Sequence, residues 1–317
     1  MCFLSSPQSL VVALGGNALL RGGQSGSFEE QNANFQPAAS KIADLVQKDY
    51  KVVVTHGNGP QIGYILLKNE IAKKYAPPFP IDACGAQTQG WIGYMIQQSL
   101  KNILNARGLE KEVITLITRV KVDKNDPAFQ NPTKPIGPFF NKDQVASIMH
   151  EQPDWIIKEY EGKGFRRVVP SPMPLQIIES KAIRTMVDAG FLVIACGGGG
   201  IPVIEKNGAS TGIDAVIDKD LASERLATLI GATKLILLTD VDGLYDNYGK
   251  SNQQLVSKIR LNEINKLKIA DLAEGDMGPK VRASLTFIEN GGKEAVIGNL
   301  KRLSESLDGT AGTHIVP

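Results

Sequence analysis

The feature that most constrains the fold is an alternation of short apolar runs with longer stretches of helical periodicity. The apolar runs are rich in β-branched residues and predict strands at residues 10–14, 51–55, 113–117, 192–196, 234–239 and 295–297. Helical spacing predicts helices at residues 34–48, 61–75, 86–107, 181–189, 220–230 and 280–290. Strands that alternate with helices require crossover connections, so we expect an α/β protein whose mainly parallel sheet is covered on both faces. Such a fold does not by itself name a function.

The alternation breaks between about residues 122 and 172. This segment is rich in proline, aromatic and charged residues, including the run NPTKPIGPFF at residues 131–140. A loop of this length without structure of its own is uncommon inside a compact domain. We therefore expect a small inserted subdomain with a helix at residues 143–151 and a hairpin formed by residues 155–160 and 166–169. The insertion could be a lid over a site, or it could be a surface excursion or an oligomer contact.

Charge and cysteine content argue against several classes of function. The 317 residues include 35 basic and 33 acidic ones, so the formal net charge is only +2. That balance gives no reason to expect a nucleic acid or a membrane as partner. Cys2, Cys84 and Cys196 are far apart and lack CxxC spacing, which argues against disulfides or a zinc site. With no recognisable secretory signal and no apolar run long enough to span a bilayer, we expect a cytoplasmic protein.

Three of the expected strands are followed by glycine-rich turns. The residues of these turns are Gly15, Gly16 and Asn17; Gly57, Asn58 and Gly59; and residues 197–200. Glycines at the carboxyl end of a parallel strand let backbone N–H groups approach an anion without a Cβ in the way. In the second turn, Pro60 suits the first position of a helix, whose N-terminus also favours anions. The turns match neither GxGxxG nor the P-loop pattern, so they predict anions along one edge of the sheet without identifying them.

Two lysines stand at expected helix starts. Lys219 lies between Asp218 and Asp220, and Lys280 follows Pro279, which we expect to be the first helical residue. Ammonium groups are point charges suited to phosphoryl transfer, which depends on positioning and charge stabilisation. The two acids could hold Lys219 in place, although alone they would also fit a solvated cluster that caps a helix. A lysine in a first helical turn opposes the helix dipole, which is tolerated more readily beside an anionic ligand.

Taken in order, these motifs resemble the amino acid kinase superfamily and, within it, the carbamate kinases. The resemblance extends over residues 10–315 and rests on ALGGNA at 13–18, THGNGPQIG at 55–63, CGAQTQGWIGY at 84–94, NPTKPIGPFF at 131–140, RRVVPSPMP at 166–174, GGGGIPV at 197–203, DAVIDKDLAS at 214–223, LLTDVDGLY at 237–245 and MGPKVRA at 277–283. It implies a single domain, 1–317, built as a three-layer αβα sandwich. Its N-terminal lobe (about 1–210) would hold the small acid and carry the inserted lid, and its C-terminal lobe (about 211–317) would hold the nucleotide.

The resemblance also implies roles for particular residues. The implied catalytic residues are Lys134, Lys219, Lys280 and Asp220, with Asp220 organising the lysines. The residues implied to bind the phosphoryl group and carbamate are Gly15, Gly16, Asn17, Gly57, Asn58 and Gly59. The residues implied to bind the nucleotide are Lys219, Asp240, Tyr245, Met277, Gly278 and Lys280. Most relatives carry a lysine in the first-strand turn, as in K-x-G-G, and this chain has none there. Lys134 of the insertion would replace it.

The reaction that the resemblance implies is reversible phosphoryl transfer between ATP and carbamate, which gives ADP and carbamoyl phosphate. Carbamate is already an anion, so its attack needs no base, and we expect no direct role for His56. Mg²⁺ is expected to arrive with the nucleotide, with no metal ligand supplied by protein side chains. Relatives commonly make ATP in this way after ornithine carbamoyltransferase in arginine breakdown.

A homodimer through the helix at residues 84–107 is also implied. One alternative function is that of another carboxylate kinase of the superfamily, such as an acetylglutamate kinase. The absent first-turn lysine and the NPTKP run argue against it. A second alternative is a catalytically silent paralogue that only binds nucleotide, although Lys134, Lys219 and Lys280 are all present.

Overall fold

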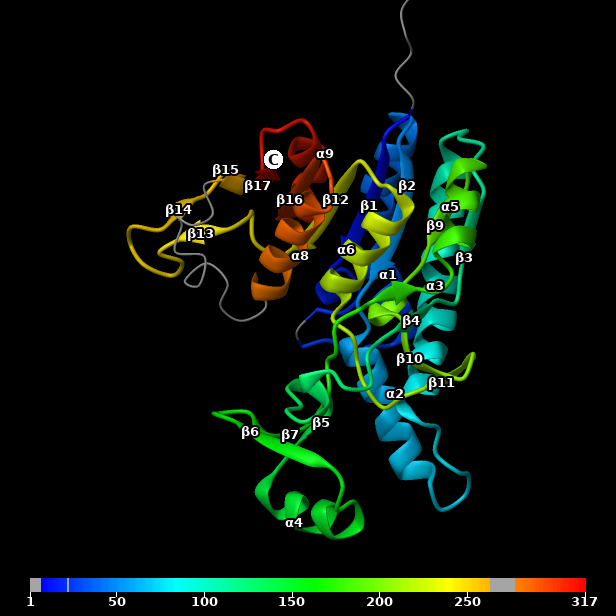
Figure 1. Ribbon diagram of the computed structural model, residues 1–317, viewed down its shortest axis with the longest axis vertical. Helices are drawn as coiled ribbons and strands as arrows, with labels where there is room; N and C mark the ends of the chain where they lie inside the picture. Colours follow the sequence, from blue (N-terminus) through cyan, green and yellow to red (C-terminus); the bar gives the residue numbers. More distant parts are fainter. Residues whose placement is uncertain (1–6, 22, 263–276) are drawn as a thin grey trace, which may run out of the picture.

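A sheet of eight strands runs through the centre of the molecule in the computed structural model, which describes residues 7–21, 23–262 and 277–317 (Figure 1). The strand order is β15 (Lys258–Arg260), β17 (Thr313–Val316), β16 (Glu294–Asn299), β12 (Lys234–Thr239), β1 (Ser9–Leu14), β2 (Lys51–His56), β9 (Leu192–Ile194) and β3 (Val113–Thr115). The strands from β16 to β3 are parallel, whereas β17 pairs antiparallel with β16 and parallel with β15. This order confirms the expected mainly parallel sheet.

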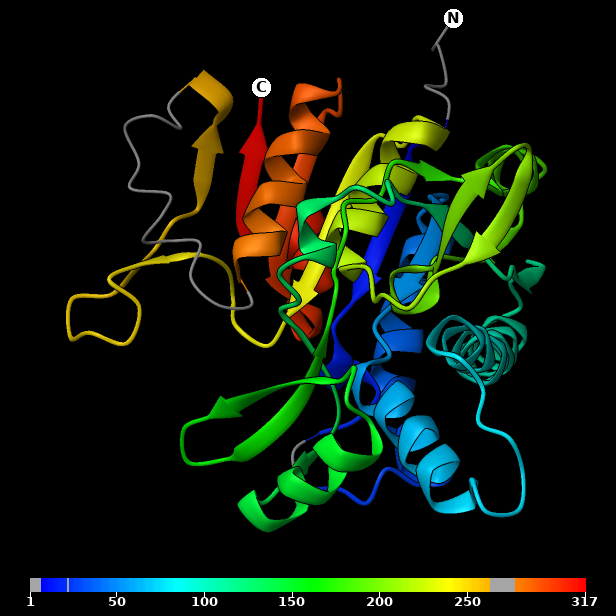
Figure 2. The ribbon, with the colours of Figure 1, turned by 60° about the horizontal axis from the view of Figure 1, so that its bottom comes forward.

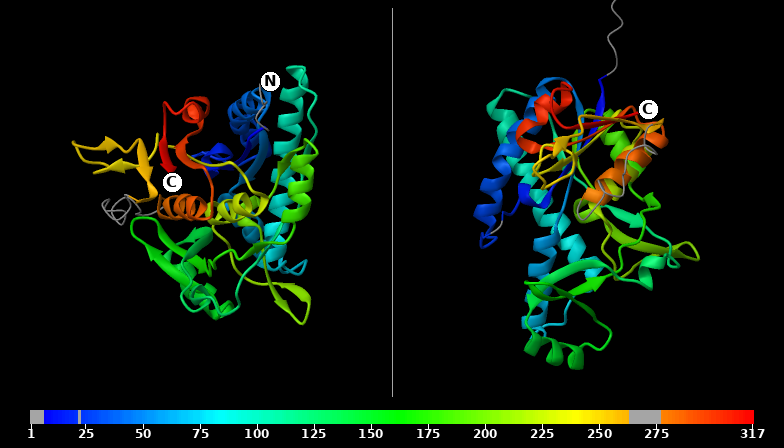
Figure 3. Two further views of the ribbon diagram at one scale, coloured as in Figure 1. Left: turned by 45° about the horizontal axis from the view of Figure 1, so that its top comes forward. Right: turned by 90° about the vertical axis from the view of Figure 1, so that its left-hand side faces the viewer.

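Helices cover both faces of this sheet. One face carries α5 (Ser180–Asp188), α6 (Lys219–Ile230) and α8 (Met277–Glu289), and the other carries α1 (Phe28–Gln47), α3 (Ile81–Ala106) and α9 (Leu303–Leu307). In the right-hand view of Figure 3, α1 and α8 lie on opposite sides of the strands. The three layers confirm the expected αβα sandwich.

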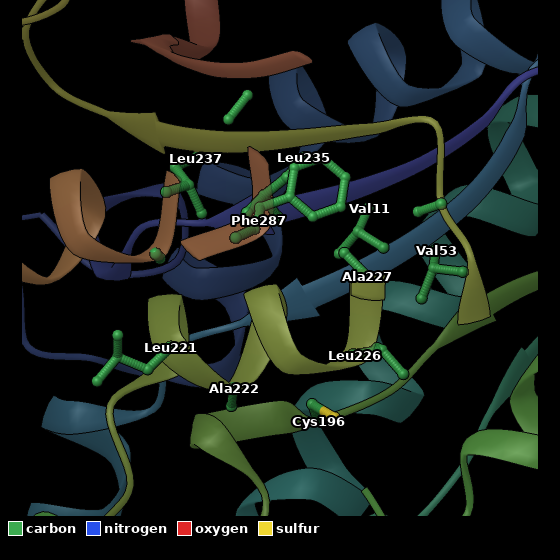
Figure 4. Packing of buried hydrophobic residues seen from close by; sticks show 14 of the residues in the cluster. Val11, Val53, Cys196, Leu221, Ala222, Leu226, Ala227, Leu235, Leu237 and Phe287 are labelled. Carbon is green, nitrogen blue, oxygen red and sulfur yellow. The ribbon is translucent and has the colours of Figure 1, made fainter. Parts of the chain in front are cut away.

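The apolar strand sequences follow from burial on both sides. Along β1, Val11 and Ala13 belong to the core beneath α6 and α8, whereas Leu10 and Val12 belong to the core beneath α1 and α3. A strand buried on both faces needs apolar residues at consecutive positions rather than at alternate ones. Figure 4 shows Val11 and other sheet residues in the first of these cores with Phe287 of α8.

Three smaller sheets complete the strand pairing of the described residues. Their orders are β11 (Ala209–Gly212), β10 (Ile201–Lys206), β4 (Arg119–Lys121) and β8 (Gln176–Ile177); β13 (Tyr245–Asp246) and β14 (Gln254–Leu255); and β5 (Lys134–Phe140), β7 (Gly164–Val169) and β6 (Ile156–Tyr160). Short 3-10 helices are η1 (Gly16–Ala18), η2 (Pro127–Phe129), η3 (Gly197–Gly199) and η5 (Leu300–Arg302). The first two of these small sheets were not expected from the sequence.

The insertion consists of the β5–β7–β6 sheet and α4 (Lys142–Glu151), and it projects from the lower end of the molecule in Figure 1. The expected helix and hairpin are therefore confirmed, and β5 is an additional edge strand. Figure 2 shows α2 (Gly59–Ala72) beside it. Ile62 of α2 packs with Ile136 and Val169 in a separate apolar cluster. A salt bridge from Lys73 to Glu151 also joins the end of α2 to α4.

Some helix starts differ from the expected ones. Helix α1 begins at Phe28 rather than at residue 34, because Ser27 and Glu30 form a reciprocal capping box. Helix α3 begins at Ile81, directly after Pro80, rather than at residue 86. Among the described residues, no helix is sufficiently long and apolar to cross a membrane. Cys84 and Cys196 are buried free thiols, and Cys2 lies outside the described residues.

Candidate active site

A cavity of about 970 Å³ lies where the carboxyl ends of β1, β2 and β12 meet α2, α6, α8 and the insertion. Among the described residues it is lined by six basic and three acidic side chains: Arg21, Lys41, Lys134, Lys219, Lys280 and Lys301, and Asp218, Asp220 and Asp240. Ligands of open α/β sheets bind beyond the carboxyl ends of the strands. An excess of positive charge in a concave site attracts anions.

The first glycine turn forms one wall of the cavity. Gly15 and Gly16 line it, and a Cβ built on Gly16 would meet no atom within 4 Å, so the backbone there faces open space. A Cβ on Gly15 would lie 3.2 Å from the carbonyl oxygen of Leu238. The backbone of Asn17 belongs to η1, but its side chain lies outside the described part of the chain.

The second turn lies beside the first, since a Cβ on Gly57 would be 3.8 Å from the backbone N of Gly16, and it makes room for a lysine. Gly57, Asn58 and Gly59 all line the cavity. A Cβ on Gly57 would lie 3.3 Å from Cδ of Lys219, so the glycine allows that side chain to pass over the turn. Helix α2 begins at Gly59, with Asn58 as its N-cap. The expectation that Pro60 is the first helical residue is therefore wrong by one position.

Buried hydrogen bonds hold the Asn58 side chain in place. Its Nδ2 donates to the Thr88 hydroxyl at 2.8 Å, and that hydroxyl donates to the Gly85 carbonyl at 2.6 Å. A Cβ on Gly198 would lie only 2.1 Å from Asn58 Nδ2. The second turn is thus fixed from behind by α3 and η3.

The third glycine run is explained mainly by packing within the chain. Residues 197–200 are buried, and of these only Gly198 lines the cavity in the described part of the protein. A Cβ on Gly199 would lie 2.3 Å from the carbonyl oxygen of Ile217, and one on Gly200 would lie 2.2 Å from Val120. The sequence suggested an anion site at each turn, but close backbone approach accounts for most of this run.

His56 is a buried neighbour of the cavity. Burial lowers the pKa of its imidazole to about 4, although a hydrogen bond to the Gly57 carbonyl opposes the shift. The ring is therefore neutral near pH 7, and Nδ1 donates to that carbonyl at 2.9 Å. The other edge of the ring packs against Gly197, where an added Cβ would lie 2.5 Å from His56 Nε2. These contacts give His56 a supporting position between two turns.

Asp220 joins two lysines at the floor of the cavity. It is only 3% exposed, and its two carboxylate oxygens accept from Lys219 Nζ at 2.5 Å and from Lys280 Nζ at 2.9 Å. Burial acts to raise the pKa of Asp220, but the two ammonium charges outweigh it and lower the pKa overall. Burial also disfavours the charged form of Lys219 and so lowers its pKa, and the charge of Asp220 opposes that effect. The charges of Asp220 and Lys219 thus support each other.

The two helices that carry this cluster begin differently from the expectation. Asp218 caps α6, so that Lys219 and Asp220 are its first two residues. In the described part of the chain α8 begins at Met277, which makes Pro279 its third residue and Lys280 its fourth. The expectation that Pro279 starts the helix was therefore wrong, although Lys280 does lie in the first turn.

Lys134 reaches the cavity from the insertion. It is the first residue of β5, and its Nζ donates to Asp218 Oδ2 at 2.8 Å. Asp218 stands directly before the residues of the lysine cluster, so the insertion meets the cluster at the start of α6. The sequence identified Lys134 as a site residue but gave no partner for it.

Only some of the predicted nucleotide-binding residues line the cavity in the described part of the protein. Asp240 lines the cavity and follows β12, whereas Tyr245, Met277 and Gly278 are not among its described lining residues. Tyr245 instead packs against Tyr248, with ring centroids 5.9 Å apart. Lining residues that the sequence did not single out include Thr239, Asn299, Leu300 and Lys301. They lie at or just after the carboxyl ends of β12 and β16, so the rule that ligands bind at strand ends could have found them.

The described residues contain no group of three or more His, Cys, Asp or Glu side chains arranged to hold a metal ion. The cavity combines glycine turns with ammonium groups that have carboxylate partners. Such a donor set suits phosphate and carboxylate groups.

The family model described as the amino acid kinase family matches residues 8–299, and the chain belongs to this family. Several relatives at high identity are carbamate kinases. The chain is 48% identical over 314 residues to carbamate kinase of Pyrococcus horikoshii, which covers 98% of this chain and all of that one. It is 44% identical over 311 residues to carbamate kinase 2 of Staphylococcus aureus, which covers 97% of this chain and 99% of that one.

Solved structures agree with the sequence relatives. Carbamate kinase of Giardia lamblia bound to AMP-PNP superposes with a TM-score of 0.92 at 42% identity, and the match covers 99% of each chain. UMP kinase of Bacillus anthracis superposes with a TM-score of 0.53 at 16% identity, which shows a shared fold alone. By family and by overall similarity, the chain groups with the carbamate kinases, which are phosphotransferases.

Proposed function

We propose that this protein is a carbamate kinase that catalyses the reversible reaction of ATP and carbamate to ADP and carbamoyl phosphate. The observation that carries the proposal is the entry of Lys134 from the insertion into the cavity that holds Lys219 and Lys280. The first-strand turn has no lysine, so a cation from elsewhere must stand near the transferring phosphoryl group. The insertion supplies it.

The chemistry needs charge compensation rather than proton transfer. In the ATP-forming direction, an oxygen of the ADP β-phosphate attacks the phosphorus of carbamoyl phosphate, and the bond from phosphorus to the carbamate oxygen breaks. Carbamate leaves as an anion, so no proton has to move. Repulsion between the two anions is the main obstacle, and positioned cations and backbone donors reduce it.

The residues of the cavity divide this work. Gly15 and Gly16 line the cavity, and their backbone N–H groups are proposed to bind the phosphoryl group together with Asn17. We assign the carbamate to Gly57, Asn58 and Gly59 of the neighbouring turn. Lys134, Lys219 and Lys280 would balance the charge on the transferring oxygens, and ion pairs with Asp220 hold Lys219 and Lys280 in place.

We place the nucleotide in the C-terminal lobe (211–317) and the carbamate in the N-terminal lobe (1–210), with the insertion (about 122–172) as the lid. Asp240, Thr239 and Lys301 line the cavity on the proposed nucleotide side. Mg²⁺ would arrive with the nucleotide and neutralise part of its phosphate charge. The positions of Tyr245, Met277 and Gly278 outside the lining do not support the roles predicted for them in nucleotide binding.

The reaction can be tested with purified protein, MgADP and carbamoyl phosphate, with ATP as the measured product. We expect ATP formation with carbamoyl phosphate and none with the phosphorylated form of N-acetylglutamate. Faster reaction with the acetylglutamyl substrate would instead identify another carboxylate kinase. A folded protein that binds ADP and turns over neither substrate would be the silent paralogue.

We further propose a homodimer through the outer face of α3. Tyr94 of α3 is 56% exposed and stacks on Phe28, with ring centroids 6.4 Å apart, and the Trp91 ring lies 6.5 Å from the same Phe28 ring. An exposed aromatic cluster of this kind is typical of protein interfaces. Tyr94→Glu should convert a dimer to a monomer in light scattering, and an unchanged mass would exclude this face.

The cellular setting follows from the same proposal. We propose that the protein works in the cytoplasm and makes ATP from carbamoyl phosphate during arginine breakdown, where ornithine carbamoyltransferase supplies that compound. Mixing the two enzymes with citrulline, phosphate and MgADP should then yield ATP and ornithine. Absence of ATP from this mixture, with carbamoyl phosphate still accepted directly, would argue against the coupling.

A further inference from the structure

The carboxylate of Asp218 has two separate tasks in the structure. Its Oδ1 accepts hydrogen bonds from the backbone N–H of Asp220 at 2.9 Å and of Leu221 at 3.4 Å, and so caps α6. Its Oδ2 accepts from Lys134 Nζ at 2.8 Å. One side chain therefore connects the insertion to the helix that begins with Lys219 and Asp220.

The rest of the insertion is attached at places that do not determine where the Lys134 side chain points. Ile136 and Val169 pack against α2 and α3, and Glu151 pairs with Lys73. These contacts fix the sheet of the insertion. The Lys134 side chain remains about one third exposed, and Asp218 is its ion-pair partner among the described residues.

A long lysine side chain has many accessible rotamers, and ordering it costs conformational entropy. The Asp218 carboxylate offsets that cost before any substrate arrives. Since the Asp218 side chain is 13% exposed, this ion pair is less screened than a pair at the surface. Lys134 is thereby held in the lining of the cavity, beside the residue that caps the helix carrying Lys219.

We propose that Asp218 is a positioning residue for phosphoryl transfer, which holds the lid lysine Lys134 beside Lys219 and Lys280 until an anionic substrate competes for it. This inference rests on the proposed kinase function. An incoming phosphoryl group offers Lys134 a more highly charged acceptor than one carboxylate does. Asp218 keeps the lysine close to that acceptor without being able to contact the reacting anion favourably, because both are negative.

The decisive variant is Asp218→Asn, since asparagine remains a good N-cap and removes only the charge that holds the lysine. We expect kcat for ATP formation to fall about 10-fold, because Lys134 is ordered less often. The KM for carbamoyl phosphate should stay the same or fall, because a negative charge near the anion is lost. A role in stability alone would not produce this split between kcat and KM.

A double substitution tests whether Asp218 acts through the lysine. In the Lys134→Ala background, Asp218→Asn should cause no further loss of kcat. Asp126→Asn is a matched control, because Asp126 also caps a short helix and accepts from Met173 N but has no lysine partner among the described residues. The control variant should keep the wild-type kcat and KM.

The outcomes separate the inference from the proposed function. If the wild type makes no ATP from carbamoyl phosphate, the function fails. If the wild type is active but Asp218→Asn keeps its kcat, raises it, or adds its full effect to that of Lys134→Ala, the positioning role is overturned. Should Asp218→Asn fail to fold, Asp218→Ser provides the same test, since serine caps a helix but is too short to reach Lys134.

Discussion

Replacing Asp220 by asparagine should destabilise the protein in a way that depends on pH. The carboxylate is buried and joins Lys219 to Lys280, so the variant keeps the shape of the site but leaves two ammonium groups without their counter-charge. Removing one partner of a buried ion pair costs about 3–5 kcal/mol. The variant can limit this loss only by releasing a proton from a lysine.

The pH dependence follows from that release. Burial lowers the pKa of Lys219 and Asp220 opposes the shift, so the variant lowers the pKa further. Neutralising a lysine from its ordinary pKa of about 10.4 costs about 5 kcal/mol at pH 7 and about 2 kcal/mol at pH 9. Between the lowered and the ordinary pKa, the unfolded state binds more protons than the native state, so the stability of the variant rises with pH. The difference in free energy of unfolding between wild type and Asp220→Asn should therefore shrink between pH 7 and pH 9.

Urea unfolding of wild type and Asp220→Asn at pH 7, 8 and 9 measures this difference directly. Asp188→Asn is the control, because Asp188 is 61% exposed and forms a surface salt bridge to Lys51 at 3.4 Å. Its free energy of unfolding should change by less than about 1 kcal/mol at every pH. A deficit for Asp220→Asn that is below 1 kcal/mol, or that stays constant from pH 7 to 9, would refute the reasoning.

Two further predictions concern stability. His314 donates from Nδ1 to Glu294 at 2.7 Å and from Nε2 to a backbone carbonyl at 2.9 Å, and the bond to Glu294 raises the pKa of the imidazole. The stability that the charged His314–Glu294 pair gives the fold is complete below the ordinary histidine pKa of about 6.5, and it is lost as pH rises through the raised pKa of His314. His314→Gln should therefore lower the melting temperature more at pH 5.5 than at pH 9. An equal loss at both values would contradict this assignment. Gly198→Ala should destabilise the protein by about 1–3 kcal/mol, because Gly198 has a φ of +65° and the new Cβ would lie 2.1 Å from Asn58 Nδ2. Unchanged stability in urea unfolding would contradict this prediction and show that Asn58 moves freely.

The elements of the central sheet could be predicted because their apolar pattern is local. Each of the six expected strands is present in the sheet, with bounds that differ by a few residues. Strand β5 was hidden by its prolines at positions 135 and 138, which remove backbone donors. It pairs only with β7 among the described strands, and an edge strand tolerates proline. The early start of α1 was readable in principle from Ser27 and Glu30, whose spacing is that of a capping box.

The site was less predictable because its contacts join distant parts of the chain. Asp220 and Lys280 are 60 residues apart, and Lys134 and Asp218 are 84 apart. Resemblance pointed to three of these residues, but only the fold reveals that Asp218 holds the lid lysine. In Asp218-Lys219-Asp220 the sequence left a helix cap and a functional cluster as alternatives. The structure contains both, since the first acid caps α6 and the second joins the lysines.

The central claim is that the insertion completes a phosphoryl-transfer site by contributing Lys134. ATP formation from carbamoyl phosphate and MgADP by the wild type and by Lys134→Ala tests it most directly. We predict an active wild type and a loss of about 100-fold or more in the variant, the scale found when a preorganised charge partner of a transition state is removed. A folded wild type that forms no ATP, or a variant as active as the wild type, would contradict the account.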